Sequence, residues 1–153
     1  MDTENLKKSI ESNYSINVKS LEKVKNSYKL ESDNSTYAIK IIKYDFGHFY
    51  FILSAIKHLQ KRSFSKIPII LKNKNNGDYI QIENQYAYLT EWIPSRVSNY
   101  NNPIELGLVA KKLGELHTCS TGFTLNRSMN PRIGWYSWIK VFETRCNEML
   151  DFK

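Results

Sequence analysis

The chain has 153 residues, of which 41% are hydrophobic and 24% charged, and its formal net charge is +7. This length and apolar content predict one domain, or one lobe of a larger domain, with a real core, and they exclude a disordered tail. Most lysines are scattered, and the one modest basic concentration (Lys57, Lys61, Arg62 and Lys66) makes nucleic-acid binding the least favoured function considered.

The cysteines and histidines do not form a recognisable site. Cys119 and Cys146 stand far apart with no CxxC spacing, and the three histidines lack the paired spacing of a metal site. We therefore expect two packed thiols and no structural metal. No signal-peptide core and no apolar run of spanning length follows Met1, so we expect a soluble, reduced, intracellular protein outside the membrane.

Residues 1–93 predict a β-rich lobe of α+β class. A short amphipathic helix is expected first, and then a meander of antiparallel strands in which apolar and polar residues alternate. The turn Ser32–Ser35 precedes the most β-prone run, which contains Lys40. The expected elements are a helix over 6–14 and strands over 16–25, 28–31 and 36–42.

The second half of this lobe predicts one helix and three strands. Apolar residues recur every three or four positions over 46–62, which indicates a helix with one buried stripe and a basic outer side. Strands are expected over 69–71, 79–82 and 86–90, with a turn at Asn75–Asp78 between the first two. The sheet should therefore hold five to six strands.

Residues 94–102 show little periodicity and predict a linker, and residues 103–153 predict the start of a helical lobe. Asn102, Pro103 and Glu105 occur in the order of an N-cap, a first-turn proline and a capping-box acid. A final helix is expected from Trp135 or Tyr136. Since no cap or breaker precedes Lys153, we expect the chain to stop inside an incomplete lobe.

Lys40 is the strongest candidate for a functional residue. An ammonium group in a strand of Ala and Ile needs either solvent or an anion. From Tyr37–Lys40 alone, exposure to solvent is the favoured interpretation. The order of elements (strand, turn, strand, lysine strand, helix, three strands, linker, helix) instead favours a nucleotide phosphate, because it is the small-lobe plan of kinase-like phosphotransferases.

Several short segments carry a family resemblance that extends from about Asn26 to Lys153. Asn26–Leu30, Tyr37–Lys40, Tyr88–Ile93 and Leu113–His117 resemble the aminoglycoside and choline phosphotransferase superfamily. Within it, Tyr44–Phe49, Ala55–Gln60 and Asn130–Trp135 resemble the CotS family of spore coat proteins. The order of these segments is more specific than any one of them.

The resemblance implies a binding site for ATP. Lys40 matches the lysine that holds the α- and β-phosphates, and the backbone of Glu91, Trp92 and Ile93 matches the segment that meets adenine. All six glycines lie at Gly47 or later, so no Gly-rich loop joins the first two strands. The turn that ends at Tyr28 would therefore provide any cover over the phosphates.

The parts that perform phosphoryl transfer are missing. No acid occurs between Phe46 and Gly77, so the helix after Lys40 cannot supply a glutamate partner, and Asp45 is expected to serve the dipole of that helix. Asp45-Phe46-Gly47 spells the kinase metal-binding motif but follows the lysine strand directly, and we interpret it as coincidence. No His is followed two residues later by Asp. The segment alone is therefore expected neither to hold a metal nor to catalyse transfer.

Two functions remain. The CotS resemblance implies a protein of sporulation that is made in the mother-cell cytoplasm and assembles with other spore coat proteins, with nucleotide binding as a vestige. The alternative is the nucleotide lobe of an ATP-dependent phosphotransferase acting on a hydroxyl of a sugar, choline-like or aminoglycoside substrate. Trp92, Trp135 and Trp138 are interpreted as core residues and not as a stacking surface.

Overall fold

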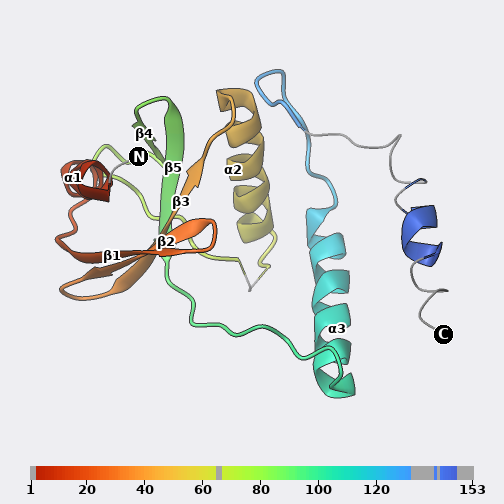
Figure 1. Cartoon of the computed structure of the whole chain (residues 1–153). Helices are drawn as coiled ribbons and strands as arrows, with labels where there is room; N and C mark the ends of the chain where they lie inside the picture. The colour runs from red at the N-terminus through yellow and green to blue at the C-terminus, as the bar shows by residue number, and fades with distance from the viewer. Residues whose placement is uncertain (1–2, 65–66, 132–139, 141, 148–153) are drawn as a thin grey trace.

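The computed structural model describes residues 3–64, 67–131, 140 and 142–147. It has the predicted α+β class, with a sheet between two helices and a longer helix to one side (Figure 1). Lys140 and residues 142–147 are also helical, while the predicted start of this helix at Trp135 or Tyr136 lies outside the described residues. The elements are α1 (Thr3–Asn13), β1 (Val18–Val24), β2 (Ser27–Ser32), β3 (Thr36–Ile42), α2 (Phe46–Lys61), β4 (Ile80–Ile82), β5 (Gln85–Glu91) and α3 (Pro103–Ser120).

The five strands form one antiparallel sheet in the order β1-β2-β3-β5-β4. The predicted meander of β1, β2 and β3 is confirmed. A two-residue connection joins β1 to β2, since Val24 pairs with Ser27. Lys25 adopts a φ of 52° in this connection, a left-handed conformation that only a tight turn normally demands of a residue with a side chain.

The predicted strand over 69–71 is wrong. Ile70 forms a single bridge with Thr90, and the Leu71 N–H donates to the Leu89 C=O at 2.8 Å, but no regular strand forms among these described residues. The physical reason lies just before the bridge. Pro68 has no N–H to donate to a ladder, and the pairing therefore cannot extend in that direction.

The core lies between α1 and one face of the sheet. Leu6, Ile10 and Tyr14 of the N-terminal segment are almost fully buried against it. Burial of the aliphatic side chains of Leu6 and Ile10 stabilises the fold by about 1.5–3 kcal/mol each, because it removes apolar surface from water. The sheet contributes Val18, Leu30, Ile39, Ile80, Ile82, Ala87 and Leu89.

Helix α2 covers part of the opposite face and confirms the helix predicted over 46–62. Phe49 and Leu53 form its buried stripe and pack against Ile42 and Tyr88. The Phe49 ring also stacks on Tyr86, with centroids 5.0 Å apart. This packing fixes α2 immediately beside the strand that carries Lys40.

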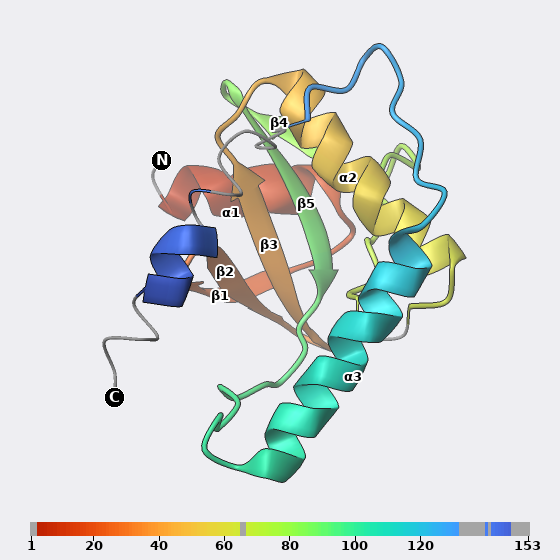
Figure 2. The same cartoon turned by 90° about the vertical axis from the view of Figure 1, so that its right-hand side faces the viewer.

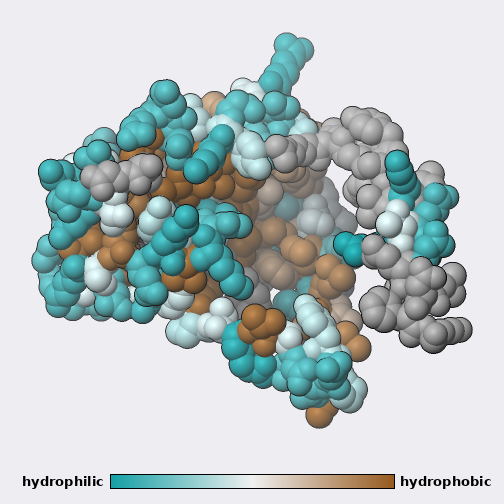
Figure 3. All heavy atoms as spheres, viewed as in Figure 1, coloured by the Kyte–Doolittle hydropathy of each residue, from teal (hydrophilic) through white to brown (hydrophobic). Residues whose placement is uncertain are grey.

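Helix α3 begins as predicted, and none of its side chains is buried. The Asn102 side chain accepts a hydrogen bond from the Ile104 N–H, and Pro103 occupies the first turn. No residue of α3 is buried: Ile104 is 73% and Leu108 61% exposed, and hydrophobic residues reach the surface in this region (Figure 3). Among the described residues, none of the helices combines the length and apolar character needed to cross a bilayer.

Candidate functional site

Lys40 lies on the face of the sheet that α1 does not cover. In β3 the neighbouring Ile39 is fully buried against α1, so alternation along the strand directs Lys40 to the other side. It pairs with Tyr88 of β5, and Ala38 on the same face pairs with Thr90. Lys40 is exposed and has no hydrogen-bonded or ion-paired partner among the described residues. An anion could therefore approach its ammonium group without displacing a carboxylate.

Lys29 shares this open face, because it pairs with Ala38 across β2 and β3. Its Nζ lies 2.8 Å from Glu31 Oε1 and 6.0 Å from the centroid of the Trp92 ring. The hydrogen bond from Lys29 lowers the pKa of Glu31, and the same bond raises the pKa of Lys29. The two lysines of the face thus differ, since Lys29 already has a carboxylate.

The end of β5 places the predicted segment 91–93 next to the lysine strand. Glu91 pairs with Tyr37, and the Trp92 N–H donates to the Thr36 C=O at 3.1 Å, which extends the pairing beyond the strand. Ile93 is half exposed after this bond. The structure therefore places Glu91 on the strand next to that of Lys40, three positions beyond Tyr88, the pairing partner of Lys40, and Trp92 and Ile93 follow the end of β5.

Tyr28 does not join this group through its side chain. It pairs with Ile39 and packs against the core on the α1 side of the sheet. Only its backbone, at the start of β2, lies near the turn that was expected to cover a phosphate. The sequence could not reveal this, because a shift of one residue in register exchanges the two faces.

Asp45 caps α2, as its expected role at the start of that helix requires. Its side chain accepts a hydrogen bond from the His48 N–H at 3.0 Å, which lowers the pKa of the carboxyl group. In the Asp45-Phe46-Gly47 motif, Asp45 is therefore the N-cap of α2, and Phe46 and Gly47 are the first residues of that helix. Among the described residues, no group of three or more His, Cys, Asp or Glu side chains could hold a metal ion.

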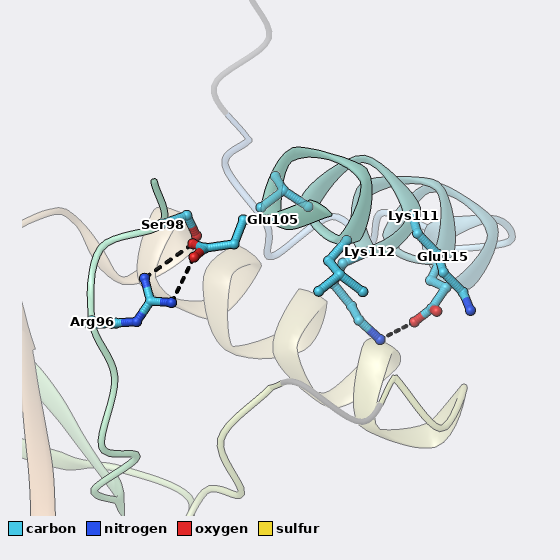
Figure 4. A pocket seen from close by; sticks show the side chains of 8 residues that line it. Arg96, Ser98, Glu105, Lys111, Lys112 and Glu115 are labelled. Carbon is cyan, nitrogen blue, oxygen red and sulfur yellow. Dashed lines mark hydrogen bonds and ion pairs between the residues drawn. The ribbon is translucent and has the colours of Figure 1, made fainter. Parts of the chain in front are cut away.

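Glu105 departs from its predicted capping-box role. Its carboxylate binds Arg96 through two hydrogen bonds of 2.8 and 3.1 Å (Figure 4). It accepts a third hydrogen bond from the Asn99 N–H. The hydrogen bonds from Arg96 and then from Asn99 lower the pKa of Glu105 to about 2. This cluster ties the segment before α3 to its first turn and borders a hollow of about 580 Å³.

The segment that follows α3 runs along α2, an arrangement that was not predicted (Figure 2). At one end His58 Nε2 lies 3.1 Å from the Thr121 C=O, and the Phe123 ring packs on His58. At the other end the Asn130 N–H donates to the Gly47 C=O at 3.0 Å. The only sequence signal was that the segments around Gly47 and Asn130 both carried the CotS resemblance.

The fold resembles that of known enzymes. The five-stranded antiparallel sheet with its helices matches the fold of the N-terminal lobes of aminoglycoside phosphotransferases of known structure. An aminoglycoside phosphotransferase from Alicyclobacillus acidocaldarius subsp. acidocaldarius DSM 446 aligns with a TM-score of 0.69 and 19% identity over 92% of this chain and 41% of that chain.

Two other solved structures share this fold. Spectinomycin phosphotransferase APH(9)-Ia, in complex with ADP and spectinomycin, has a TM-score of 0.69 and 16% identity over 97% of this chain and 47% of its own. The amicoumacin kinase hAmiN, in complex with AMP-PNP, Ca²⁺ and Ami, has a TM-score of 0.67 and 16% identity over 94% and 48%. The chain thus spans less than half the length of each.

The family follows from the sequence itself. The chain matches the family described as "Spore coat putative kinase YutH" over residues 7–152, and it belongs to that family. The predicted kinship with spore coat proteins of kinase-like fold is therefore confirmed. A comparison with curated protein sequences found no match.

Proposed function

We propose that this protein is an assembly component of the spore coat that keeps a kinase-like lobe, and that the Lys40 face of this lobe binds ATP without transferring its phosphate. Family membership supports the association with the coat. The observation that carries the nucleotide part is the exposed ammonium group of Lys40, which has no carboxylate partner among the described residues.

The residues present fit a nucleotide but not a transfer reaction. Lys40 offers a positive charge to a phosphate group, and Glu91 ends the neighbouring strand, with Trp92 and Ile93 directly after it. Helix α2 has no carboxylate to orient the lysine, and Asp45 is engaged as a cap. Bound ATP would therefore gain affinity from Lys40 without meeting a catalytic base or a metal site in this part of the chain.

Titration calorimetry with MgATP tests the nucleotide part. The full chain should bind MgATP weakly, and Lys40→Ala should reduce the affinity about five-fold or more, because a charge-assisted contact to phosphate is lost. Lys43→Ala is the matched control, since Lys43 is exposed just beyond the end of β3. Absence of binding at millimolar MgATP, or an equal loss in both variants, would refute it.

Localisation in sporulating cells tests the assembly part. Lys40→Ala should still associate with the spore coat at the wild-type level, because the proposed assembly role does not use the nucleotide. Loss of coat association by a Lys40→Ala protein that folds normally would contradict this role.

The second candidate is the nucleotide lobe of a phosphotransferase acting on a hydroxyl of a small molecule. It is favoured by the solved structures that share the fold and contain ADP or AMP-PNP. A full-length protein that converts ATP to ADP in the presence of an aminoglycoside, a choline-like compound or a sugar would establish this function in place of the first.

A further inference from the structure

A second hollow lies beside α2. It has a volume of about 390 Å³ and is bounded by α2, by the residues before β4 and by the segment after α3. Its walls are partly aromatic, with Tyr50 on α2, Tyr79 before β4 and Phe123 after α3. Three separate parts of the chain thus build one groove.

The charge of this groove is positive. Asp78 is the one carboxylate that lines it among the described residues, and it already binds Lys57 at 2.5 Å and Lys72 at 2.7 Å. Burial would raise the pKa of Asp78, but the hydrogen bonds from Lys57 and Lys72 outweigh it, so the pKa is lowered and the group stays ionised. Lys61 lines the same groove with no carboxylate partner among the described residues.

The sequence explains why this charge stays uncompensated. No Asp or Glu occurs between Phe46 and Gly77, so all of α2 and most of the following loop carry no negative charge. Three lysines therefore face a single aspartate around the groove. Because Asp78 is the one carboxylate of the lining in the described part of the chain, an acid brought by a partner would complete the pairing.

We propose that this groove docks a short acidic segment of a partner protein, with a carboxylate at Lys61 and an apolar or aromatic side chain between Tyr50 and Phe123. The inference rests on the proposed assembly role, because it names a surface through which assembly would occur. Aromatic walls next to a basic rim suit a peptide. The ring surfaces provide apolar contact, and the positive charge of the rim favours an acidic segment over a basic one.

A protein segment fits this groove better than nucleic acid does. Binding along a nucleic-acid backbone needs several free cations that follow successive phosphates. Here Lys57, the other lysine of the lining, is already held by Asp78, so Lys61 is the one lining lysine without a carboxylate partner among the residues that the structure describes. The aromatic residues of the lining, Tyr50, Tyr79 and Phe123, can receive an apolar side chain of a peptide.

The test uses the full chain and a labelled peptide of alternating Glu and Phe, with fluorescence anisotropy as the readout. We expect saturable binding that weakens as salt rises and that falls about five-fold or more in Lys61→Glu. Lys23→Glu changes the net charge equally on exposed β1 and should leave the affinity within about two-fold. Thermal melting of both variants checks that they fold.

Several outcomes would overturn the proposal. These are the absence of saturable binding, an equal effect of both variants, unchanged binding when Phe is replaced by Ser in the peptide, and tighter binding of duplex DNA than of the peptide. Retention of Lys61→Glu in the spore coat despite lost peptide binding would also exclude this groove as the coat contact. Failure of the wild-type protein to reach the coat would refute the assembly role, while the peptide titration would still decide the groove.

Discussion

The backbone N–H of Asn130 donates a hydrogen bond to the C=O of Gly47 at 3.0 Å, and the Asn130 C=O lies 3.1 Å from His48 Nδ1. The contact leaves little room for a side chain at Gly47. A Cβ atom placed on Gly47 would lie 3.0 Å from Asn130 Cβ and 3.2 Å from the Ser128 C=O. The start of α2 and the segment after α3 are therefore fitted to each other.

Substitution of Gly47 tests this fit. In Gly47→Ala the added methyl group should push the Asn130 segment away from α2, and the Asn130 amide should exchange its hydrogen at least about ten-fold faster. Amides of β3 should keep their protection, because the core lies elsewhere. Unchanged protection of the Asn130 amide would contradict the proposed fit.

The matched substitution is Gly114→Ala in α3, where nothing lies within 4 Å of the added Cβ atom. Alanine has the higher helix propensity, so this variant should stabilise α3 by up to about 1 kcal/mol. Helix content measured by circular dichroism and the thermal midpoint should both rise or stay unchanged. A clear fall in either would show that Gly114 has a contact that the structure lacks.

The cap of α2 gives a third prediction. Asp45→Ala removes the acceptor for the His48 N–H and should lower the thermal midpoint by about 2–4 °C. Asp45→Asn keeps a side-chain oxygen and should stay close to the wild type, since Asn caps helices as well as Asp does. If both variants lose the same stability, the charge and not the cap is responsible.

Phe49 should be the most sensitive residue of α2. Its side chain is fully buried and contacts the rings of Tyr79 and Tyr86, so Phe49→Ala should lower the free energy of unfolding by about 3–5 kcal/mol. Ile69→Ala, at a residue that is 64% exposed, should change it by no more than about 0.5 kcal/mol. Urea denaturation of the two variants compares them, with Phe49→Leu as a milder change should Phe49→Ala not fold.

The stability of the chain should depend on pH through Glu105. Its pKa in the folded protein is about 2, below the ordinary value of 4.5, so the carboxylate stabilises the fold above the unfolded pKa. That contribution should be lost as the pH falls from about 4.5 towards 2. The stability difference between wild type and Glu105→Gln should shrink over this window in urea titrations, and a difference that stays constant would exclude Glu105 as the source.

The fold was predictable where the signal was local. The alternation in β3, the three-to-four periodicity of α2 and the sequence Asn102-Pro103 each determine a single element, and the structure contains all three. The prediction of a strand over 69–71 was wrong because it relied on the apolar character of these residues. Pro68 has no N–H to donate, and only one bridge forms, between Ile70 and Thr90.

The candidate site was predictable only in part, because register and long-range contacts decide the rest. The position of Lys40 in a strand could be predicted from the β-prone residues around it. Its exposure to solvent is consistent with the lack of an acidic residue in α2. The face occupied by Tyr28 depends on the pairing of β2 with β3, which no single segment encodes. The binding of Glu105 to Arg96 instead of its own helix cap likewise depends on the path of the preceding linker.

The contacts of the segment after α3 have a mechanical consequence. The chain leaves the sheet at Trp92, forms α3, and then returns to both ends of α2 through Thr121 and Asn130. Helix α3 is therefore connected to the rest of the fold at both ends, by the linker before Pro103 and by the contact of Thr121 with α2. Its position relative to α2 thus depends on both connections and not on the linker alone.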